Sequence, residues 1–166
     1  MKSDLMPVCF KKISDAEFKA YAKWSVSAYA DHLIKSGDEK LKWKARKEAK
    51  AEFCDIYPDK AGSKDTWLYV IHNENDEKIG VIGYQKSPFD SETAFIIENV
   101  IKEEFRGKGY GKSAFIKLQE DAKEKGFPKM TLNCFKHTPI SFSMYQKNGF
   151  KIIEDYGGSV IMEKVL

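Results

Sequence analysis

The chain has 166 residues, 42% of them hydrophobic, which fits a single domain over residues 1–166 with one core. Lysine and arginine total 28 against 25 acids, a balance that does not indicate a nucleic-acid-binding protein. The three cysteines are widely spaced without a C-x-x-C pair, which indicates neither a disulfide framework nor a metal site and favours a reducing, cytoplasmic location. No run approaches the roughly eighteen apolar residues that span a bilayer, and residues 1–5 lack a signal-peptide core, so no membrane association is expected.

The first sixty or so residues predict a short strand and two helices. Residues 7–13 have the pattern of a strand, and Ser14 and Glu17 form a capping box that starts a helix ending at Gly37. Asp38 is expected to cap a second helix, which ends before Pro58. Acids are interspersed among the lysines of this second helix, so a solvated face is favoured over a nucleic-acid patch.

The remaining residues predict strands interrupted by two helices. Strands are predicted over residues 66–72, 78–85, 93–101, 129–135, 150–154 and 159–164. Turn-forming residues connect the first three of these strands, which predicts an antiparallel meander. One helix is predicted from Ser113 to Lys125, just before Gly126, and Pro139 occupies the first position of another. The order β-α-α-β-β-β-α-β-α-β-β predicts an α+β fold with a mixed, largely antiparallel sheet and helices on both faces.

The segment between the strand at residues 93–101 and the next helix carries the strongest functional signal. It reads Arg106-Gly107-Lys108-Gly109-Tyr110-Gly111-Lys112. Its glycines lack the Cβ atoms that would keep a ligand away from backbone N–H groups, and its three cations add positive charge. A site for phosphate at a helix N-terminus is therefore predicted.

Two common phosphate motifs fit this segment poorly. A Walker A motif ending at residues 111–113 needs a glycine where Arg106 stands. A dinucleotide motif, G-x-G-x-x-A, matches residues 109–114, but the acid expected about twenty residues later is missing between Lys129 and Asn133. An NAD(P)-dependent reductase is therefore a lesser alternative.

The segment resembles instead the [Gln/Arg]-x-x-Gly-x-[Gly/Ala] loop of the GCN5-related N-acetyltransferase (GNAT) family, with Arg106, Gly109 and Gly111 at the defined positions. A second stretch, residues 138–150, resembles the family's helix that ends in Leu-Tyr-x-Lys-x-Gly-Phe. The matching residues are Tyr145, Lys147, Gly149 and Phe150, with Met144 in place of leucine. The stretch departs from the family at Thr138, where asparagine is common.

The resemblance implies an acetyl-CoA-dependent N-acetyltransferase that moves an acetyl group directly to a primary amine in a ternary complex. Coenzyme A is then expected to contact the end of the 93–101 strand, the glycine-rich segment and the start of the last helix. These cofactor-binding residues are Asn99, Val100, Ile101, Arg106, Gly107, Lys108, Gly109, Tyr110, Gly111, Lys112 and Thr138. In the family, a bulge splays the fourth strand from the fifth and admits the cofactor like an added strand.

Two residues are expected to carry the proton transfers. Tyr145 lies where the family places the general acid that protonates the leaving thiolate. Some members have a glutamate base on the fifth strand, where Asn133 stands here. Glu98, an acid within an apolar strand, is the first candidate for the base, and His137 is the second. Cys134, close to His137, is more typical of packed core than of a nucleophile.

The acceptor is a small-molecule or peptide amine that the sequence does not identify. In the family, the first two helices shape the acceptor site, and here they and the residues just after them carry Trp24, Tyr29, Trp43 and Tyr57. A homodimer is compatible with the sequence, and no metal is expected. A non-catalytic acyl-CoA-binding or sensing module is the main alternative to an enzyme.

Overall fold

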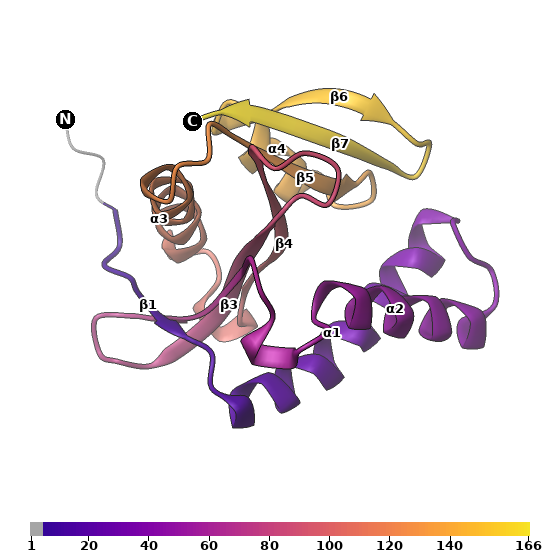
Figure 1. Cartoon of the computed structure of the whole chain (residues 1–166), viewed down its shortest axis with the longest axis horizontal. Helices are drawn as coiled ribbons and strands as arrows, with labels where there is room; N and C mark the ends of the chain where they lie inside the picture. Colours follow the sequence, from indigo (N-terminus) through magenta and orange to yellow (C-terminus); the bar gives the residue numbers. More distant parts are fainter. Residues whose placement is uncertain (1–4) are drawn as a thin grey trace. The chain divides into compact units, whose positions relative to one another are not determined.

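The computed structural model describes residues 5–166, and its elements follow the predicted order (Figure 1). The expectation that no signal peptide is present falls largely on residues 1–4, which lie outside the described residues. The chain forms two compact units, each built from separate segments. The first unit contains residues 5–13, 65–132 and 164–166, and the second contains residues 14–64 and 133–163.

The first unit is built on an antiparallel meander. Its strands are β1 (Cys9–Lys12), β2 (Thr66–His72), β3 (Lys78–Lys86), β4 (Thr93–Ile101) and the beginning of β5 (Lys129–Phe135). β1 to β4 pair antiparallel in sequence order, and β4 pairs in parallel with β5. The turn-rich connections between β2, β3 and β4 predict this antiparallel pairing for those three strands. The largest fully buried side chains of β2 and β3 are Ile71, Ile79, Ile82 and Tyr84.

One helix, α3 (Tyr110–Glu124), contacts β3 and β4 in this unit. Its buried face comprises Ala114, Phe115, Leu118 and Ala122. The helix begins at Tyr110 rather than at Ser113, so three residues expected in the glycine-rich loop are helical. The reason is that Gly109, at a φ of 90°, ends the loop in the left-handed conformation directly before a buried tyrosine.

The second unit contains α1 (Asp15–Ser36), α2 (Lys42–Ile56), α4 (Pro139–Lys147), β6 (Lys151–Asp155) and most of β7 (Ser159–Val165). The predicted capping box starts α1: the N–H of Glu17 donates to Ser14 Oγ at 3.2 Å, and the N–H of Ser14 donates to Glu17 Oε2 at 2.8 Å. Gly37, at a φ of 82°, ends the helix as predicted. α1 and α2 lie side by side (Figure 1), with Ala30, Leu33, Ala45 and Ala49 buried between them.

The start of α2 differs from the prediction. Leu41 is the N-cap residue, and Asp38 is not. The Asp38 carboxylate accepts a hydrogen bond from Ser36 Oγ at 2.6 Å, at the end of α1. The Glu39 carboxylate accepts the N–H groups of Lys40 and Leu41 at 2.8 and 2.9 Å, just before α2. The prediction was wrong because the Asp38 carboxylate is hydrogen-bonded to the hydroxyl of Ser36. The residue type alone does not indicate which neighbouring group the aspartate will bind.

The strands of residues 5–166 form one seven-stranded sheet in the order β1-β2-β3-β4-β5-β7-β6, and β6 pairs antiparallel with β7. The sheet is mostly antiparallel, and the same residues form four α-helices. This mixed α+β fold is the class that the sequence predicts. Within residues 5–166, no helix is both long enough and apolar enough to cross a membrane.

Candidate functional site

β4 carries a bulge in the middle of the strand. Gly83 of β3 pairs with Glu98, but the next residue, Tyr84, pairs with Ile96, so Ile97 is an extra residue in β4. A bulge increases the local twist of a strand and redirects the residues that follow it. Glu98 is therefore the first residue after a break in the regular strand.

The pairing of β4 changes near this bulge. In the part of the chain that the structure describes, the parallel ladder with β5 covers Thr93, Ala94 and Phe95. The antiparallel ladder with β3 continues past the bulge as far as Ile101. The end of β4 that is predicted to bind the cofactor thus lies beyond the three residues of this parallel pairing with β5.

Glu98 has a hydrogen bond within its own strand. The residue is half-buried, and its carboxylate Oε1 accepts the backbone N–H of Asn99 at 3.1 Å. Asn99 and Val100 are half-buried as well, whereas Ile101 is buried. A partly exposed carboxylate with a hydrogen-bond donor costs less than one in a closed core, which accounts for an acid in this apolar strand.

The glycine-rich segment has the geometry of an anion site. Gly107 and Gly109 have φ values of 74° and 90°, in the region that glycine adopts without strain. Gly109 is the N-cap residue of α3, and no side chain caps the helix there. The N–H groups of Tyr110, Gly111 and Lys112 open the helix and have no acceptor one turn earlier within it. The positive end of the helix dipole lies at the same place, as the sequence predicted.

Two cations of the segment are held by backbone carbonyls. Arg106 Nε donates to the carbonyl oxygen of Ile101 at 2.8 Å, and Lys108 Nζ donates to that of Glu104 at 3.2 Å. Arg106, Lys108 and Lys112 are all exposed. The bond from Arg106 ties the glycine-rich segment to the end of β4, so the first unit brings these two parts of the predicted site together.

Tyr110 uses its side chain differently from the rest of the segment. The residue is only 5% exposed, and its hydroxyl donates to both carboxylate oxygens of Glu74, at 3.0 and 2.9 Å. Its ring lies edge-on to that of Phe105. Only the backbone of Tyr110 is therefore left to contribute to a ligand site at the start of α3.

The second unit contains the other two predicted site residues. Thr138 is the N-cap residue of α4, but its side chain makes no capping bond; its hydroxyl donates to the carbonyl of Phe135 at 2.6 Å. Tyr145 is half-buried in the last turn of α4, and the centroid of its ring lies 6.3 Å from that of Phe150. The two residues lie at opposite ends of one helix.

His137 has a partner that the sequence did not indicate. Its Nε2 atom lies 2.8 Å from Nδ1 of His32, and the two rings stack. His32 also stacks on Phe135, with ring centroids 5.0 Å apart. Burial lowers the pKa of His32 and of His137, which favours a neutral pair at pH 7. Nδ1 of His137 is buried and lacks a hydrogen-bond partner among the described residues.

Cys134 is packed rather than reactive. The residue is 3% exposed, and burial raises the pKa of its thiol, so the thiolate is disfavoured at neutral pH. The interpretation as packed core is confirmed. Across residues 5–166, no group of three or more His, Cys, Asp or Glu side chains is arranged to hold a metal ion.

The aromatic residues expected near an acceptor differ in their surroundings. Tyr57 is buried against Phe18 and belongs to the core, whereas Trp24 and Trp43 are exposed. Tyr29 is half-buried, and burial, followed by the neighbouring carboxylate of Glu52, raises its pKa. Of these residues, Tyr29 combines partial exposure with acidic surroundings.

A family model described as "Acetyltransferase (GNAT) family" matches residues 32–150, a range that contains the β4 bulge, the glycine-rich segment and α4. The chain belongs to the GNAT family of acetyltransferases. The resemblance inferred from the two motifs is confirmed. Members of the GNAT family use acetyl-CoA as the acyl donor.

Two relatives that are named N-acetyltransferases cover most of the chain. The N-acetyltransferase YycN of Bacillus subtilis (strain 168), whose role is uncharacterized, is 26% identical over 162 residues, which are 97% of this chain and 100% of the relative. The spermidine N(1)-acetyltransferase of Thermoplasma acidophilum is 30% identical over 142 residues, 80% of this chain and 88% of the relative. The enzyme class of this chain is therefore N-acetyltransferase.

Solved structures agree with the family. The crystal structure of YycN from Bacillus subtilis superposes with a TM-score of 0.84 at 25% identity and covers 90% of this chain and 95% of its own. The PaiA N-acetyltransferase from Thermoplasma acidophilum, solved in complex with coenzyme A, has a TM-score of 0.71 at 20% identity over 97% of this chain and 100% of its own. The second likeness shows the GNAT fold alone.

The sequence patterns did not indicate two residues that contact predicted site residues, Glu74 and His32. Glu74 lies in a connection that the sequence indicates only as a turn, and His32 lies on α1 in the same turn of helix as Tyr29 and Leu33. An acid in a turn and a histidine on a half-buried helix face are weak signals. Their partners, Tyr110 and His137, are distant in sequence, so no local pattern indicates the pairs.

Proposed function

We propose that this protein transfers an acetyl group from acetyl-CoA to a primary amine of a cationic acceptor, directly and in a ternary complex, within one N-acetyltransferase domain. The observation that carries the proposal is the start of α3, where Gly109 leaves the first N–H groups of the helix uncapped beside three exposed cations. Such a place suits the diphosphate of coenzyme A.

The cofactor is proposed to extend from this loop along the end of β4. The amides of its pantetheine arm pair with backbone groups of Asn99, Val100 and Ile101, as an added strand pairs with a sheet edge. The Ile101 carbonyl already accepts a hydrogen bond from Arg106 Nε, so Asn99 and Val100 supply most of the backbone groups that pair with the pantetheine arm. Gly107 and Lys108 complete the loop around the diphosphate, and Thr138, the N-cap residue of α4, is proposed to contact the cofactor as well.

The proton transfers are proposed to belong to Glu98 and Tyr145. An alkylamine with a pKa of about 10.4 is protonated at neutral pH and attacks only after losing a proton, which Glu98 accepts directly or through water. The amine nitrogen then bonds to the thioester carbonyl carbon, the C–S bond breaks, and the hydroxyl of Tyr145 gives its proton to the leaving thiolate. The attacking nitrogen loses its second proton as the amide forms, and this proton restores the Tyr145 hydroxyl, while the proton held by Glu98 passes to solvent.

Direct transfer is favoured over a covalent acetyl-enzyme. A thioester intermediate needs a reactive thiolate, and Cys134 is buried with a raised pKa. The cysteines Cys9, Cys54 and Cys134 are all free thiols, which fits the cytoplasmic location that we propose.

The acceptor is proposed to be a cationic aliphatic amine of the polyamine type. One relative is named a spermidine N(1)-acetyltransferase. In this chain, burial raises the pKa of Tyr29, and the carboxylates of Glu52, Glu48 and Asp38 raise it further. The Glu52 side chain is also hydrogen-bonded to the tyrosine. An acidic region on α1 and α2 attracts a molecule with several ammonium groups more strongly than one with a single ammonium.

A thiol-release assay with acetyl-CoA tests this function. The amine panel contains spermidine, a diamine, an N-terminal peptide and a monoamine, and we expect the highest kcat/KM for spermidine. Glu52→Gln should lower kcat/KM for spermidine by about two- to fivefold, as expected for loss of one exposed charge contact, and leave the monoamine unchanged. Glu124→Gln, which removes an exposed acid from α3, is the matched control. The absence of amine-dependent thiol release from every amine would refute the proposed function.

A further inference from the structure

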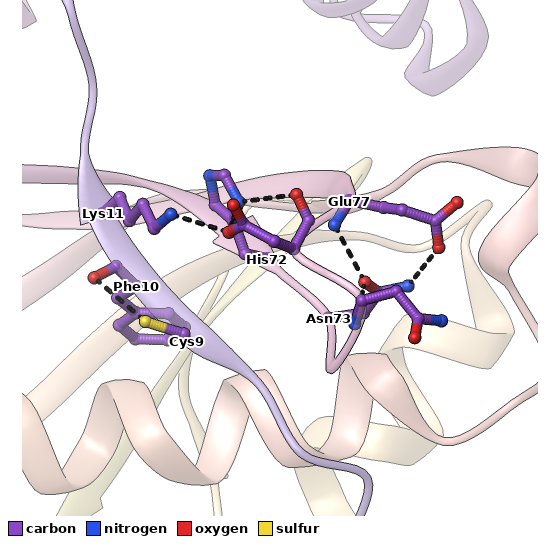
Figure 2. A network of polar contacts seen from close by, with 8 residues as sticks. Cys9, Phe10, Lys11, His72, Asn73 and Glu77 are labelled. Carbon is purple, nitrogen blue, oxygen red and sulfur yellow. Dashed lines mark hydrogen bonds and ion pairs between the residues drawn. The ribbon is translucent and has the colours of Figure 1, made fainter.

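The turn between β2 and β3, residues 73–77, is held by a buried asparagine. The Oδ1 atom of Asn73 accepts the backbone N–H groups of Asn75 and Glu77, both at 3.0 Å. Its amide nitrogen donates to the Glu77 carboxylate at 2.7 Å, and Figure 2 shows these bonds closing the turn. Asn73 is 7% exposed, so its own side of these bonds is shielded from water, and the three bonds together favour one shape of the turn.

The same turn is connected to β1 and β2. The Asp76 carboxylate accepts Lys11 Nζ of β1 at 2.6 Å and lies 2.9 Å from Nδ1 of His72, the last residue of β2. Figure 2 shows Lys11 and His72 converging on this part of the turn. The exposed lysine contact contributes little by itself, but with the buried His72 it fixes the turn from both strands.

Glu74 extends from this braced turn to the start of α3. Both of its carboxylate oxygens accept the hydroxyl of Tyr110, at 3.0 and 2.9 Å, and the hydrogen bond raises the pKa of the tyrosine, which therefore stays a donor. Tyr110 is the first residue of α3, immediately after the N-cap Gly109. A fixed acid in one turn thus holds the first turn of the helix at the proposed diphosphate site.

We propose that Glu74 is a positioning residue for the cofactor: through Tyr110, it holds the uncapped N–H groups of α3 in the arrangement that receives the diphosphate. The inference rests on the proposed function, because it needs coenzyme A at the start of α3. Glu74 does not touch the cofactor and acts only through the tyrosine.

The physical reason lies in the glycines of the segment. Gly107 and Gly109 permit many backbone conformations, so ordering the loop when a ligand binds costs conformational entropy. The hydrogen bond from Tyr110 to Glu74 restricts the start of α3 before the ligand binds, so less conformational entropy is lost on binding. The affinity for the ligand rises although no new contact to it is made. The carboxylate charge itself opposes a diphosphate, so its presence here is explained by the hydrogen bond and not by attraction.

Steady-state kinetics of Glu74 variants with two acyl donors distinguish a positioning role of Glu74 from a general effect on the stability of the protein. Acetyl-CoA contains the diphosphate, and S-acetylpantetheine lacks it. For Glu74→Ala we expect the Kd of coenzyme A and the KM of acetyl-CoA to rise about five- to twentyfold, with kcat unchanged, because preorganisation is lost. The KM of S-acetylpantetheine should stay the same. Glu74→Gln keeps an acceptor oxygen and should show a smaller loss, which also covers the case in which Glu74→Ala folds poorly.

Two further variants complete the experiment. Glu104→Gln removes an exposed acid beside the loop without touching Tyr110, and it should leave the Kd of coenzyme A unchanged or lower. Tyr110→Phe should weaken coenzyme A binding as Glu74→Ala does, and the double variant should be no weaker than either single variant.

The outcomes distinguish the two proposals. Equal changes in KM for both donors, or fully additive losses in the double variant, would overturn the role of Glu74 while leaving the proposed function intact. If the wild-type protein fails to bind coenzyme A, the proposed function fails and the inference fails with it.

Discussion

Nδ1 of His32 lies 2.8 Å from Nε2 of His137, and this hydrogen bond connects α1 to the segment after β5 within the second unit. The two rings stack, and Phe135, the last residue of β5, also stacks on His32. Burial lowers the pKa of each histidine, with the neighbouring positive charge of Lys35 acting in the same direction. Protonation of the pair therefore costs free energy in the folded protein.

Acidification should destabilise the protein through this pair. Because each folded-state pKa lies below the ordinary 6.5, the unfolded chain binds more protons than the folded chain once the pH falls below that value. Urea unfolding at about pH 7.5 and about pH 5 should show a lower free energy of unfolding at the acidic pH. In His32→Phe, which keeps a ring against Phe135, the difference between the two pH values should be smaller. Equal differences in both proteins would exclude the pair as a cause.

Gly111→Ala should separate folding from cofactor binding. A Cβ atom at Gly111 would meet Ile101 Cγ1 at 3.6 Å, an ordinary contact, so the unliganded fold should be unaffected. The methyl group would stand at the N–H groups that we propose face the diphosphate, and we expect the Kd of coenzyme A to rise by about tenfold or more, by analogy with other glycine loops that admit phosphate.

Gly62→Ala is the matched control, since a Cβ atom there meets no atom within 4 Å. Calorimetric titration with coenzyme A should give the wild-type Kd for the control. An unchanged Kd in a folded Gly111→Ala protein would show that the start of α3 is not the diphosphate site.

Tyr145→Phe should lower kcat by about ten- to a thousandfold and leave the Kd of coenzyme A nearly unchanged, as expected when a general acid is lost. The defect should shrink as the pH rises, because free thiolate becomes a more acceptable product near the thiol pKa of about 8.5. Steady-state kinetics across pH measure both effects. Tyr156→Phe, at an exposed tyrosine of the same unit, should retain wild-type turnover. Full activity of Tyr145→Phe at neutral pH would assign the tyrosine to packing.

Glu98→Gln should reduce turnover at neutral pH by about tenfold or more while coenzyme A still binds, since the amine would lose its proton acceptor. Activity should recover at higher pH, where solvent deprotonates an amine with a pKa of about 10.4. Glu92→Gln, an exposed acid before β4, is the control and should keep the wild-type profile. Wild-type turnover with an unchanged pH profile in Glu98→Gln would exclude Glu98 as the base. His137, or deprotonation of the amine by solvent with no protein base, would then be the first candidate.

Local patterns predicted most of the fold because their causes are local. The capping box of Ser14 and Glu17 and the stop at Gly37 depend on residues within one or two turns, and both are confirmed. The start of α2 was predicted wrongly because Ser36 binds the expected cap, Asp38. Propensity alone does not decide which of two neighbouring polar groups a side chain will bond.

The candidate site was predictable where a motif is contiguous and not where contacts join distant residues. The prediction that the glycine-rich segment binds an anion, which stays a prediction, follows from composition and spacing. The bulge at Ile97 depends on the register between β3 and β4, which no single strand specifies. The bond from Tyr110 to Glu74 likewise joins two segments that only the fold brings together.

Product analysis of a complete reaction tests direct acetyl transfer most directly. The protein is incubated with acetyl-CoA, with and without spermidine, and free thiol, acetylated amine and acetylated protein are each quantified by mass spectrometry and thiol titration. We predict equal amounts of thiol and acetylated spermidine, no acetylated protein without the amine, and intersecting lines when both substrates are varied in initial-rate measurements. Thiol release that does not depend on any amine, or an acetylated protein that forms first and then passes its acetyl group to the amine, would contradict direct transfer in a ternary complex.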